Sequence, residues 1–244
     1  MMTLKSTFLY KWIQKQDFIY PVLQQCIFCD QNAYTPVCKI CAKGIITFKD
    51  SDPQCEGFIN NRPDIRKHRP NLNQHKILAV GPHKGQLMAL INQYKYGKKM
   101  LLAPMLTEYF YDLTVVSYGN TPYPQAILPV PIHFLKRMSR GFNQTELLCK
   151  NIQSHIGISA PNNLLQRSKF TQAQAGKSGK QRRNVKWSPF KIKDKEAIKK
   201  LSHIALVDDV ITTGTTLNQL IHTIKQVNPD IKIDLWCLSV SLPH

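Results

Sequence analysis

Short apolar runs alternate with amphipathic stretches along the chain from Ile77 onward. The runs at 77–80, 126–130 and 204–207 have the length of buried strands, and 231–240 alternates as a closing strand does. Between these runs, apolar residues recur three and four positions apart, the spacing of a helix that buries one face. The helical positions are Leu87, Leu90, Ile91 and Tyr94, then Leu102, Leu106, Tyr109, Phe110 and Leu113, then a helix over about 143–155, then Leu217, Leu220, Ile221 and Ile224.

This order of elements predicts an α/β fold, with a mostly parallel sheet flanked by helices. In such sheets, ligands bind beyond the carboxyl ends of the strands. Composition divides the chain further. Residues 1–49 hold an N-terminal segment and a cysteine-rich module, and 50–76 are polar, basic and proline-containing, as in a linker or surface connection. The predicted sheet and helices occupy 77–244, within which 166–200 is strongly basic.

The net charge of the chain indicates which classes of molecule it binds. Its 244 residues contain 33 Lys and Arg against 15 Asp and Glu, a formal net charge of +18. Such an excess favours polyanionic partners, which are nucleic acid, nucleotide phosphates or an acidic membrane surface, although a basic proteome or simple solubility would also produce it. No run approaches the ~18 apolar residues of a membrane span, and residues 1–20 do not have the pattern of a secretory signal. We therefore expect a cytoplasmic protein with reduced thiols.

Four of the seven cysteines form two CxxC pairs, Cys26 with Cys29 and Cys38 with Cys41. Thiolates at this spacing can close a tetrahedral zinc site, and four cysteine ligands leave no position open for a substrate, so the zinc would be structural. A redox role or coincidence is the alternative, but redox motifs normally occur singly, beside a βαβ unit. Cys149 and Cys237 are expected to be small buried apolar residues.

The most informative run is 205–217, in which a hydrophobic strand leads to Asp208 and Asp209, a turn of threonines around Gly214, and then an amphipathic helix. The first turn of a helix offers unpaired N–H groups and a positive dipole to a phosphate, and glycine permits close approach of the backbone. Two carboxylates at the strand end can accept hydrogen bonds from the hydroxyls of a sugar. Ordinary helix capping is the alternative, but a cap needs only one such residue.

This run resembles the phosphoribosyl pyrophosphate (PRPP) motif of type I phosphoribosyltransferases, and it lacks the GK[ST] of a Walker loop. The resemblance implies that the acidic pair binds the ribose hydroxyls, that the turn surrounds the 5-phosphate, and that Mg²⁺ bridges pyrophosphate and ribose oxygens. It assigns catalytic roles to Asp208 and Asp209. The implied PRPP-binding residues are Asp208, Asp209, Val210, Thr212, Thr213, Gly214, Thr215 and Thr216.

Further segments extend the resemblance to nearly the whole chain. They are the two CxxC pairs, Tyr94-Lys95-Tyr96-Gly97, Pro129-Val130-Pro131, Gly141-Phe142-Asn143-Gln144 and Gln174-Ala175-Gly176-Lys177-Ser178. Together they resemble the ComF family, also called ComFC or GntX, of competence-associated proteins. The resemblance implies a type I phosphoribosyltransferase fold with a small N-terminal zinc-binding module. It also implies a role in natural transformation, with single-stranded DNA and PRPP as ligands and a ComFA-type DNA-translocating helicase or other competence proteins as partners.

For the basic residues around this site, the sequence leaves two interpretations of each. Arg137 and Arg140 follow a strand end, where they would hold pyrophosphate or begin a solvated basic helix. Lys177, Arg182 and Arg183 would belong to a lid that excludes water from the site, or to an exposed basic loop. Lys95 and Tyr96 would contact a ligand or end a helix.

Three functional hypotheses remain open from the sequence: a transferase that moves phosphoribose to an unidentified acceptor (a nucleobase or nucleic acid), a single-stranded DNA-binding protein of transformation that retains PRPP binding, and a PRPP or nucleotide sensor without turnover. The basic excess favours a DNA contact. Candidate stacking residues beside the basic segments are Tyr94, Tyr96, Phe142, Phe170, Trp187 and Phe190.

Overall fold

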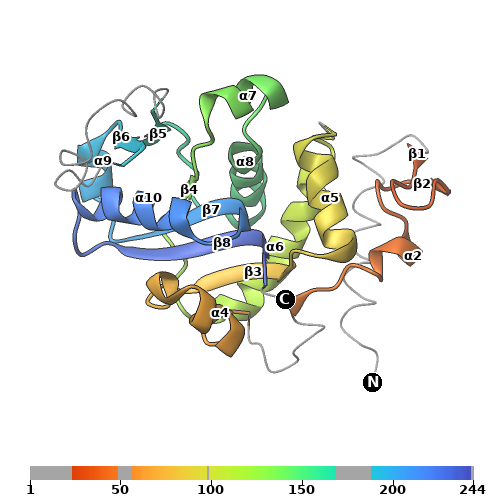
Figure 1. Cartoon of the computed structure of the whole chain (residues 1–244), viewed down its shortest axis with the longest axis horizontal. Helices are drawn as coiled ribbons and strands as arrows, with labels where there is room; N and C mark the ends of the chain where they lie inside the picture. The colour runs from red at the N-terminus through yellow and green to blue at the C-terminus, as the bar shows by residue number, and fades with distance from the viewer. Residues whose placement is uncertain (1–23, 49–56, 98, 169–187, 243–244) are drawn as a thin grey trace, which may run out of the picture.

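A four-stranded parallel sheet forms the centre of the protein (Figure 1). The computed structural model describes residues 24–48, 57–97, 99–168 and 188–242. The strands are β3 (Ile77–Pro82), β8 (Lys232–Val240), β7 (His203–Ile211) and β4 (Ala126–Pro129), hydrogen-bonded in the order β3-β8-β7-β4. Every neighbouring pair is parallel, so all four carboxyl ends lie at one edge of the sheet.

Helices cover both faces of the sheet. On one face lie α5 (Gly85–Lys95), α6 (Leu102–Tyr118) and α8 (Gln144–Ile156), and on the other lie α10 (Thr215–Lys225), α4 (Pro63–His68) and the 3₁₀ turn η1 (Pro70–Leu72). This arrangement confirms the predicted α/β fold with a mostly parallel sheet. The remaining elements are α7 (Phe134–Arg140), α9 (Lys195–Lys199) and an antiparallel ribbon of β5 (Leu165–Arg167) and β6 (Phe190–Ile192).

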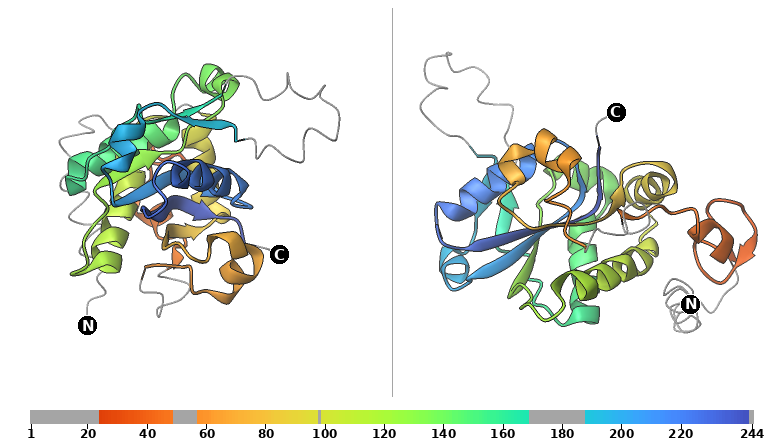
Figure 2. Two further views of the ribbon diagram at one scale, coloured as in Figure 1. Left: turned by 90° about the vertical axis from the view of Figure 1, so that its left-hand side faces the viewer. Right: turned by 90° about the horizontal axis from the view of Figure 1, so that it is seen from below.

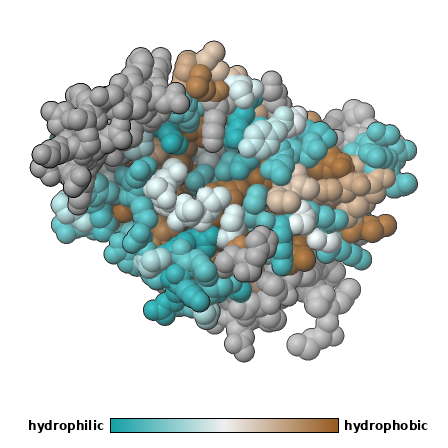
Figure 3. Space-filling model, in the orientation of Figure 1, coloured by the Kyte–Doolittle hydropathy of each residue, from teal (hydrophilic) through white to brown (hydrophobic). Residues whose placement is uncertain are grey.

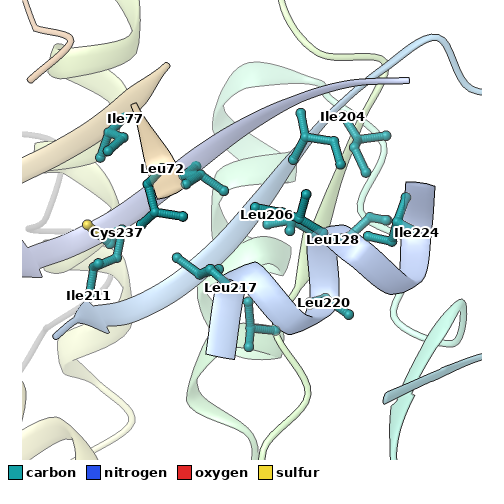
Figure 4. Close-up of a cluster of buried hydrophobic side chains, with 14 of the residues drawn as sticks. Leu72, Ile77, Leu128, Ile204, Leu206, Ile211, Leu217, Leu220, Ile224 and Cys237 are labelled. Carbon is teal, nitrogen blue, oxygen red and sulfur yellow. The ribbon is translucent and has the colours of Figure 1, made fainter. Parts of the chain in front are cut away.

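Alternating side chains of the strands supply two separate cores. In β7, Ile204 and Leu206 pack against α10, whereas Ala205 and Val207 face α5, α6 and α8. Figure 4 shows the first of these cores, with Leu217, Leu220 and Ile224 of α10 directed at the sheet. All of these residues are buried, and each fully buried Leu or Ile contributes about 1.5–3 kcal/mol through removal of apolar surface from water.

The alternation breaks at the carboxyl end of β7. Val207 and Val210 both pack towards the α5 side, three positions apart, and Ile211 packs on the opposite side. Asp208 and Asp209 occupy the two positions between them. The expected strand ended at residue 207, but the observed strand continues to Ile211, so the acidic pair lies within the strand rather than after it. The continued pairing with β8, which holds Val210 against Ser239, explains the added length.

The segment expected to be a basic linker is partly core. Within 57–76, Ile59, Ile65 and Leu72 are fully buried, and α4 and η1 carry two of them onto the α10 face. Phe58 also forms a bridge with Leu78 of β3. This segment is polar and rich in proline overall, so its composition did not predict that its few, widely spaced apolar residues pack against the sheet.

The N-terminal module lies at one end of the molecule (Figure 2). It consists of the short pair β1 (Gln24–Gln25) and β2 (Asn32–Ala33) and the single-turn helix α2 (Lys39–Ala42). Val37, Ala42 and Ile45 join the core beside α5, which attaches the module to the larger domain. Among the described residues, no helix combines the length and the apolar character that crossing a membrane requires.

Candidate functional site

The threonine-rich turn lies between β7 and α10, at the carboxyl edge of the sheet. Thr212, Thr213 and Thr215 are exposed, and Thr216 is half-buried. Gly214 is the N-cap of α10 with φ of +78°, and no side chain caps the helix. As in any helix, the first amides of α10 lack intrahelical acceptors, and the amide of Thr215 donates to Oγ1 of Thr213 at 3.4 Å. Helix amides beside threonine hydroxyls are what a phosphate site requires.

Two contacts from the η1 region hold this turn. A Cβ atom added at Gly214 would lie 2.6 Å from Cδ1 of Leu72, so the turn packs directly on η1. The buried guanidinium of Arg69 donates through Nε to the carbonyl oxygen of Thr212 at 2.7 Å, and through Nη2 to the carbonyl of Ser241. Its Nη1 is buried without a hydrogen-bond partner among the described residues. The segment expected to be a linker thus positions the turn.

The two acidic residues have different surroundings. Asp208 is half-buried, and its Oδ1 accepts the amide of Asp209 at 2.8 Å. Burial, followed by the charge of Asp209, raises the pKa of Asp208 to about 7. Asp209 is buried, and its Oδ1 lies 2.9 Å from Nζ of Lys95. The sequence suggested equal roles in sugar binding, whereas the structure leaves Asp208 more open and gives Asp209 an ion-pair partner.

Lys95 is the last residue of α5, and Tyr96 follows it. This end of the helix contacts the predicted segment that contains Arg140 and Gln144. The hydroxyl of Tyr94 donates to the carbonyl of Gln144 at 2.8 Å, and Nη1 of Arg140 donates to Oε1 of Gln144 at 3.0 Å. The guanidinium of Arg140 lies over the ring of Tyr96, 4.9 Å from its centroid. The Tyr94–Gly97 and Arg140–Gln144 motifs, which are far apart in sequence, therefore form one contact region beside the acidic pair.

The predicted pyrophosphate residues occupy contrasting positions. Arg140 is buried through the contacts with Gln144 and Tyr96. The side chain of Arg137 is 58% exposed and lies 3.3 Å from Glu146. Asn143 caps α8 by accepting the amide of Thr145, and it also donates to Glu146. The predicted lid residues Lys177, Arg182 and Arg183 lie outside the described residues, as do Phe170 and Trp187.

Sequence reasoning missed two groups near the acidic pair. Arg167 of β5 is half-buried, its guanidinium lies 5.3 Å from the ring centroid of Phe190, and its Nε is buried without a partner among the described residues. Burial lowers the pKa of Arg167, and the charge of Asp208 partly offsets this effect. No sequence signal distinguishes Arg167 from the other cations of its basic segment.

His83 is the second missed group. It directly follows β3, its amide donates to the carbonyl of Val240, and its Nδ1 lies 2.8 Å from Oγ of Ser239. Burial lowers the pKa of His83, and the charge of Lys95 lowers it further. The rule that ligands bind beyond the carboxyl ends of parallel strands would have identified this residue, because the first predicted strand ends just before it.

The four paired cysteines form a separate cluster. The sulfur atoms of Cys26, Cys29, Cys38 and Cys41 all lie within 4.8 Å of one another. In a tetrahedral zinc site with Zn–S bonds of about 2.3 Å, the sulfurs are about 3.8 Å apart, so this donor set fits the ion. Burial raises the pKa of Cys26, but backbone hydrogen bonds, led by the amide of Cys38, bring it down to about 6, which favours a thiolate. Cys149 and Cys237 are buried in the cores, as predicted.

Known proteins similar to this chain carry names that refer to competence and to DNA utilization. Competence protein F of Haemophilus influenzae is 29% identical over 228 residues, which cover 88% of this chain and 96% of that protein. The DNA utilization protein YhgH is 25% identical in Salmonella typhi and 26% identical in Escherichia coli, in each case over 84% of this chain and 91% of the relative. The chain is a homologue of competence protein F. This finding confirms the family resemblance drawn from its motifs. No family model matches the chain.

Proposed function

We propose that this homologue of competence protein F binds PRPP with Mg²⁺ at the carboxyl edge of its sheet, and that it acts in the uptake or cytoplasmic handling of single-stranded DNA. The observation that carries the first part is the turn 212–216. Its threonines lie at the N-terminus of α10, where Gly214, the N-cap residue, has no side chain to cap the helix. A 5-phosphate would satisfy both the unpaired amides and the helix dipole.

The charges beside the turn support a ligand with both sugar hydroxyls and phosphates. Asp208 would accept ribose hydroxyls or bind Mg²⁺, a hard cation that prefers oxygen ligands. The charge of the same carboxylate acts on the pKa of Arg167, whose buried Nε lacks a partner among the described residues. An anionic group of the ligand would supply that partner, because burying an unpaired donor costs about 1–3 kcal/mol.

The proposed structural cofactor is zinc, held by Cys26, Cys29, Cys38 and Cys41. Bound there, zinc would join two short segments that have almost no secondary structure of their own. The proposed role in DNA handling comes from the names of the relatives and from the net charge of +18, which suits a polyanionic partner. A DNA-translocating helicase is the protein partner that we propose.

Calorimetric titration of the full chain with PRPP and Mg²⁺ tests the sugar-phosphate site. Asp208→Asn is the sharper variant, since removal of Asp209 would leave Lys95 buried without its partner. We expect wild-type protein to bind and Asp208→Asn to bind at least about tenfold more weakly, equivalent to about 1.4 kcal/mol. Glu108→Gln, which removes a carboxylate from the ion pair with His155, is the control. Equal PRPP affinity in wild type and Asp208→Asn would rule out the assignment.

A second candidate function is phosphoribosyl transfer, and His83 is the observation that favours it. The bond between C1 of the ribose and the pyrophosphate oxygen would break, a bond from C1 to an acceptor nitrogen or oxygen would form, and the acceptor proton would pass to the imidazole. Its lowered pKa keeps His83 neutral near pH 7, the form that accepts a proton. Release of pyrophosphate with a nucleobase or oligonucleotide acceptor tests this function. If the protein binds PRPP but releases no pyrophosphate with any acceptor, a sensor without turnover is favoured.

A further inference from the structure

Exposed apolar side chains gather near the proposed site. Half of the large hydrophobic residues that are exposed in the described part of the chain lie in two short segments, 96–101 and 134–138. They are Tyr96, Met100, Leu101, Phe134, Leu135 and Met138. Figure 3 shows brown hydrophobic residues over α7 at the top of the molecule. Soluble proteins rarely gather such residues on a surface that contacts only water.

The stacked pair of Arg140 and Tyr96 joins the two segments. Arg140 ends α7, and Tyr96 follows the last helical residue of α5. Arg140 is buried against one face of the ring, yet Tyr96 remains 68% exposed, so the rest of the ring is open to solvent. A Cβ atom at Gly97 would lie 2.7 Å from the carbonyl oxygen of Gln93, so only glycine allows the chain to turn tightly just after Tyr96.

The two segments that carry these apolar residues contain basic residues and no acidic ones. The sequence contains no acidic residue between Asp64 and Glu108, and none between Asp112 and Glu146. The two segments thus supply cations without carboxylates, including exposed Lys99 and Arg137. Glu146 lies at the border, where it pairs with Arg137. A polyanion can approach such a surface without local repulsion.

We propose that Tyr96, supported by Arg140 and flanked by α7, forms the surface that binds single-stranded DNA. One base stacks on the open face of Tyr96, neighbouring bases contact Leu135 and Met138, and the phosphates lie along Lys99 and Arg137. The inference rests on the proposed role in DNA handling, and it places the nucleic acid beside the contact region that also contains Lys95 and Asp209. Single-stranded-DNA proteins commonly combine a cationic groove with an aromatic stacking residue.

The mixed chemistry of the surface favours a single strand over a duplex. In a duplex the base faces are stacked inside and only phosphates and groove edges are accessible, so an exposed aromatic ring would gain no base to stack on. An anionic membrane would also suit apolar and basic residues together. A planar ring held by an arginine is the feature that a membrane does not require, and Tyr96 is therefore the residue to test.

Fluorescence anisotropy of a labelled oligothymidylate with the full chain provides the measurement. We expect Tyr96→Ala to weaken binding between about fivefold and about 150-fold, as for the loss of one base stack, and Tyr96→Phe to retain wild-type affinity. Tyr96→Leu, which remains apolar but loses the ring, should behave like Tyr96→Ala. Tyr34→Ala is the matched control, because Tyr34 is 59% exposed in the N-terminal module.

Each outcome has one interpretation. Wild-type affinity in Tyr96→Leu, the same loss in Tyr34→Ala, or no oligothymidylate binding by the wild type would overturn the surface. Tyr96-dependent binding of anionic phospholipid vesicles, without oligonucleotide binding, would assign the surface to a membrane instead. Separate titration with PRPP distinguishes the two proposals: Tyr96-dependent oligonucleotide binding by a protein that ignores PRPP supports this surface and overturns only the sugar-phosphate site.

Discussion

Nζ of Lys95 lies 2.9 Å from Oδ1 of Asp209, with both side chains only 12% exposed. The contact joins the end of α5 to the carboxyl end of β7, and so links the Tyr94–Gly97 motif to the acidic pair. It neutralises one of two adjacent carboxylates that would otherwise repel each other. Asp208 is then the carboxylate available to the proposed sugar or metal ion.

We expect Lys95→Met to lower the free energy of unfolding by about 3 kcal/mol, because removal of one partner leaves a buried charge uncompensated. Urea denaturation measures the change, and Lys99→Met, at an exposed lysine, is the control. The double variant Lys95→Met with Asp209→Asn should recover part of the loss, since it removes the orphaned charge. A loss below about 1 kcal/mol in Lys95→Met would mean that water already screens the pair.

The affinity for PRPP with Mg²⁺ should rise with pH across the pKa of Asp208, which burial and Asp209 raise to about 7. Below that pH the carboxyl group is protonated and is a poorer ligand for Mg²⁺. Because the ligand phosphates titrate in a similar range, the informative quantity is the difference between wild type and Asp208→Asn. Calorimetry on both sides of neutrality should give a steeper increase for the wild type, and identical pH profiles would contradict the prediction.

The same raised pKa predicts how stability depends on pH. Between the ordinary pKa of 3.8 and about 7, the folded chain keeps a proton on Asp208 that the unfolded chain has released. The contribution of Asp208 to stability is therefore complete below the lower value and is lost as pH rises through about 7. Denaturation at a series of pH values should show this decline in wild type and a weaker one in Asp208→Asn. A parallel decline in both would assign it to other groups.

Gly214→Ala should destabilise the protein for two reasons: the positive φ of 78°, and a Cβ atom placed 2.6 Å from Leu72. Gly157→Ala measures the effect of the backbone conformation alone, because Gly157 has a similar φ of 80° and an added Cβ there would have nothing within 4 Å. We expect about 1–2 kcal/mol for Gly157→Ala from the backbone alone, and a further 1–3 kcal/mol or so for Gly214→Ala from overpacking. If chemical denaturation gave the same loss of unfolding free energy for both variants, Leu72 and η1 would move to accommodate the added Cβ atom without cost.

Purified protein should contain about one zinc ion per chain, held by the four paired cysteines. The double variant Cys26→Ser with Cys29→Ser should lose the metal and melt at a lower temperature, because a structural zinc contributes directly to folding. Elemental analysis and thermal unfolding measure the two effects. Cys149→Ala, at a buried cysteine outside the cluster, should keep the zinc. A metal-free wild type with unchanged thermal stability would exclude the site.

Much of the fold followed from local patterns. The strands predicted at 77–80 and 126–130 are close to the observed β3 and β4, and the helix expected at 143–155 is α8, capped by Asn143. The contribution of 57–76 to the core was not predicted, for a physical reason: its few apolar residues are isolated, so no window of the sequence has a helical or strand period. Only contact with the sheet shows that Ile59, Ile65 and Leu72 are core residues.

The sequence by itself determined the approximate positions of the four central strands and of α5, α6, α8 and α10. It also determined the paired cysteines and the order of carboxylates, threonines and glycine in the turn, because all of these depend on residues close together along the chain. Tertiary structure alone decided that Lys95 pairs with Asp209, that Arg69 holds the turn, and that Arg140 stacks on Tyr96. Each of these contacts joins segments 44 or more residues apart, whose meeting depends on how helices pack on the sheet. Which side chains can ionise follows from the sequence, but their partners, their exposure and their pKa values are set by the fold.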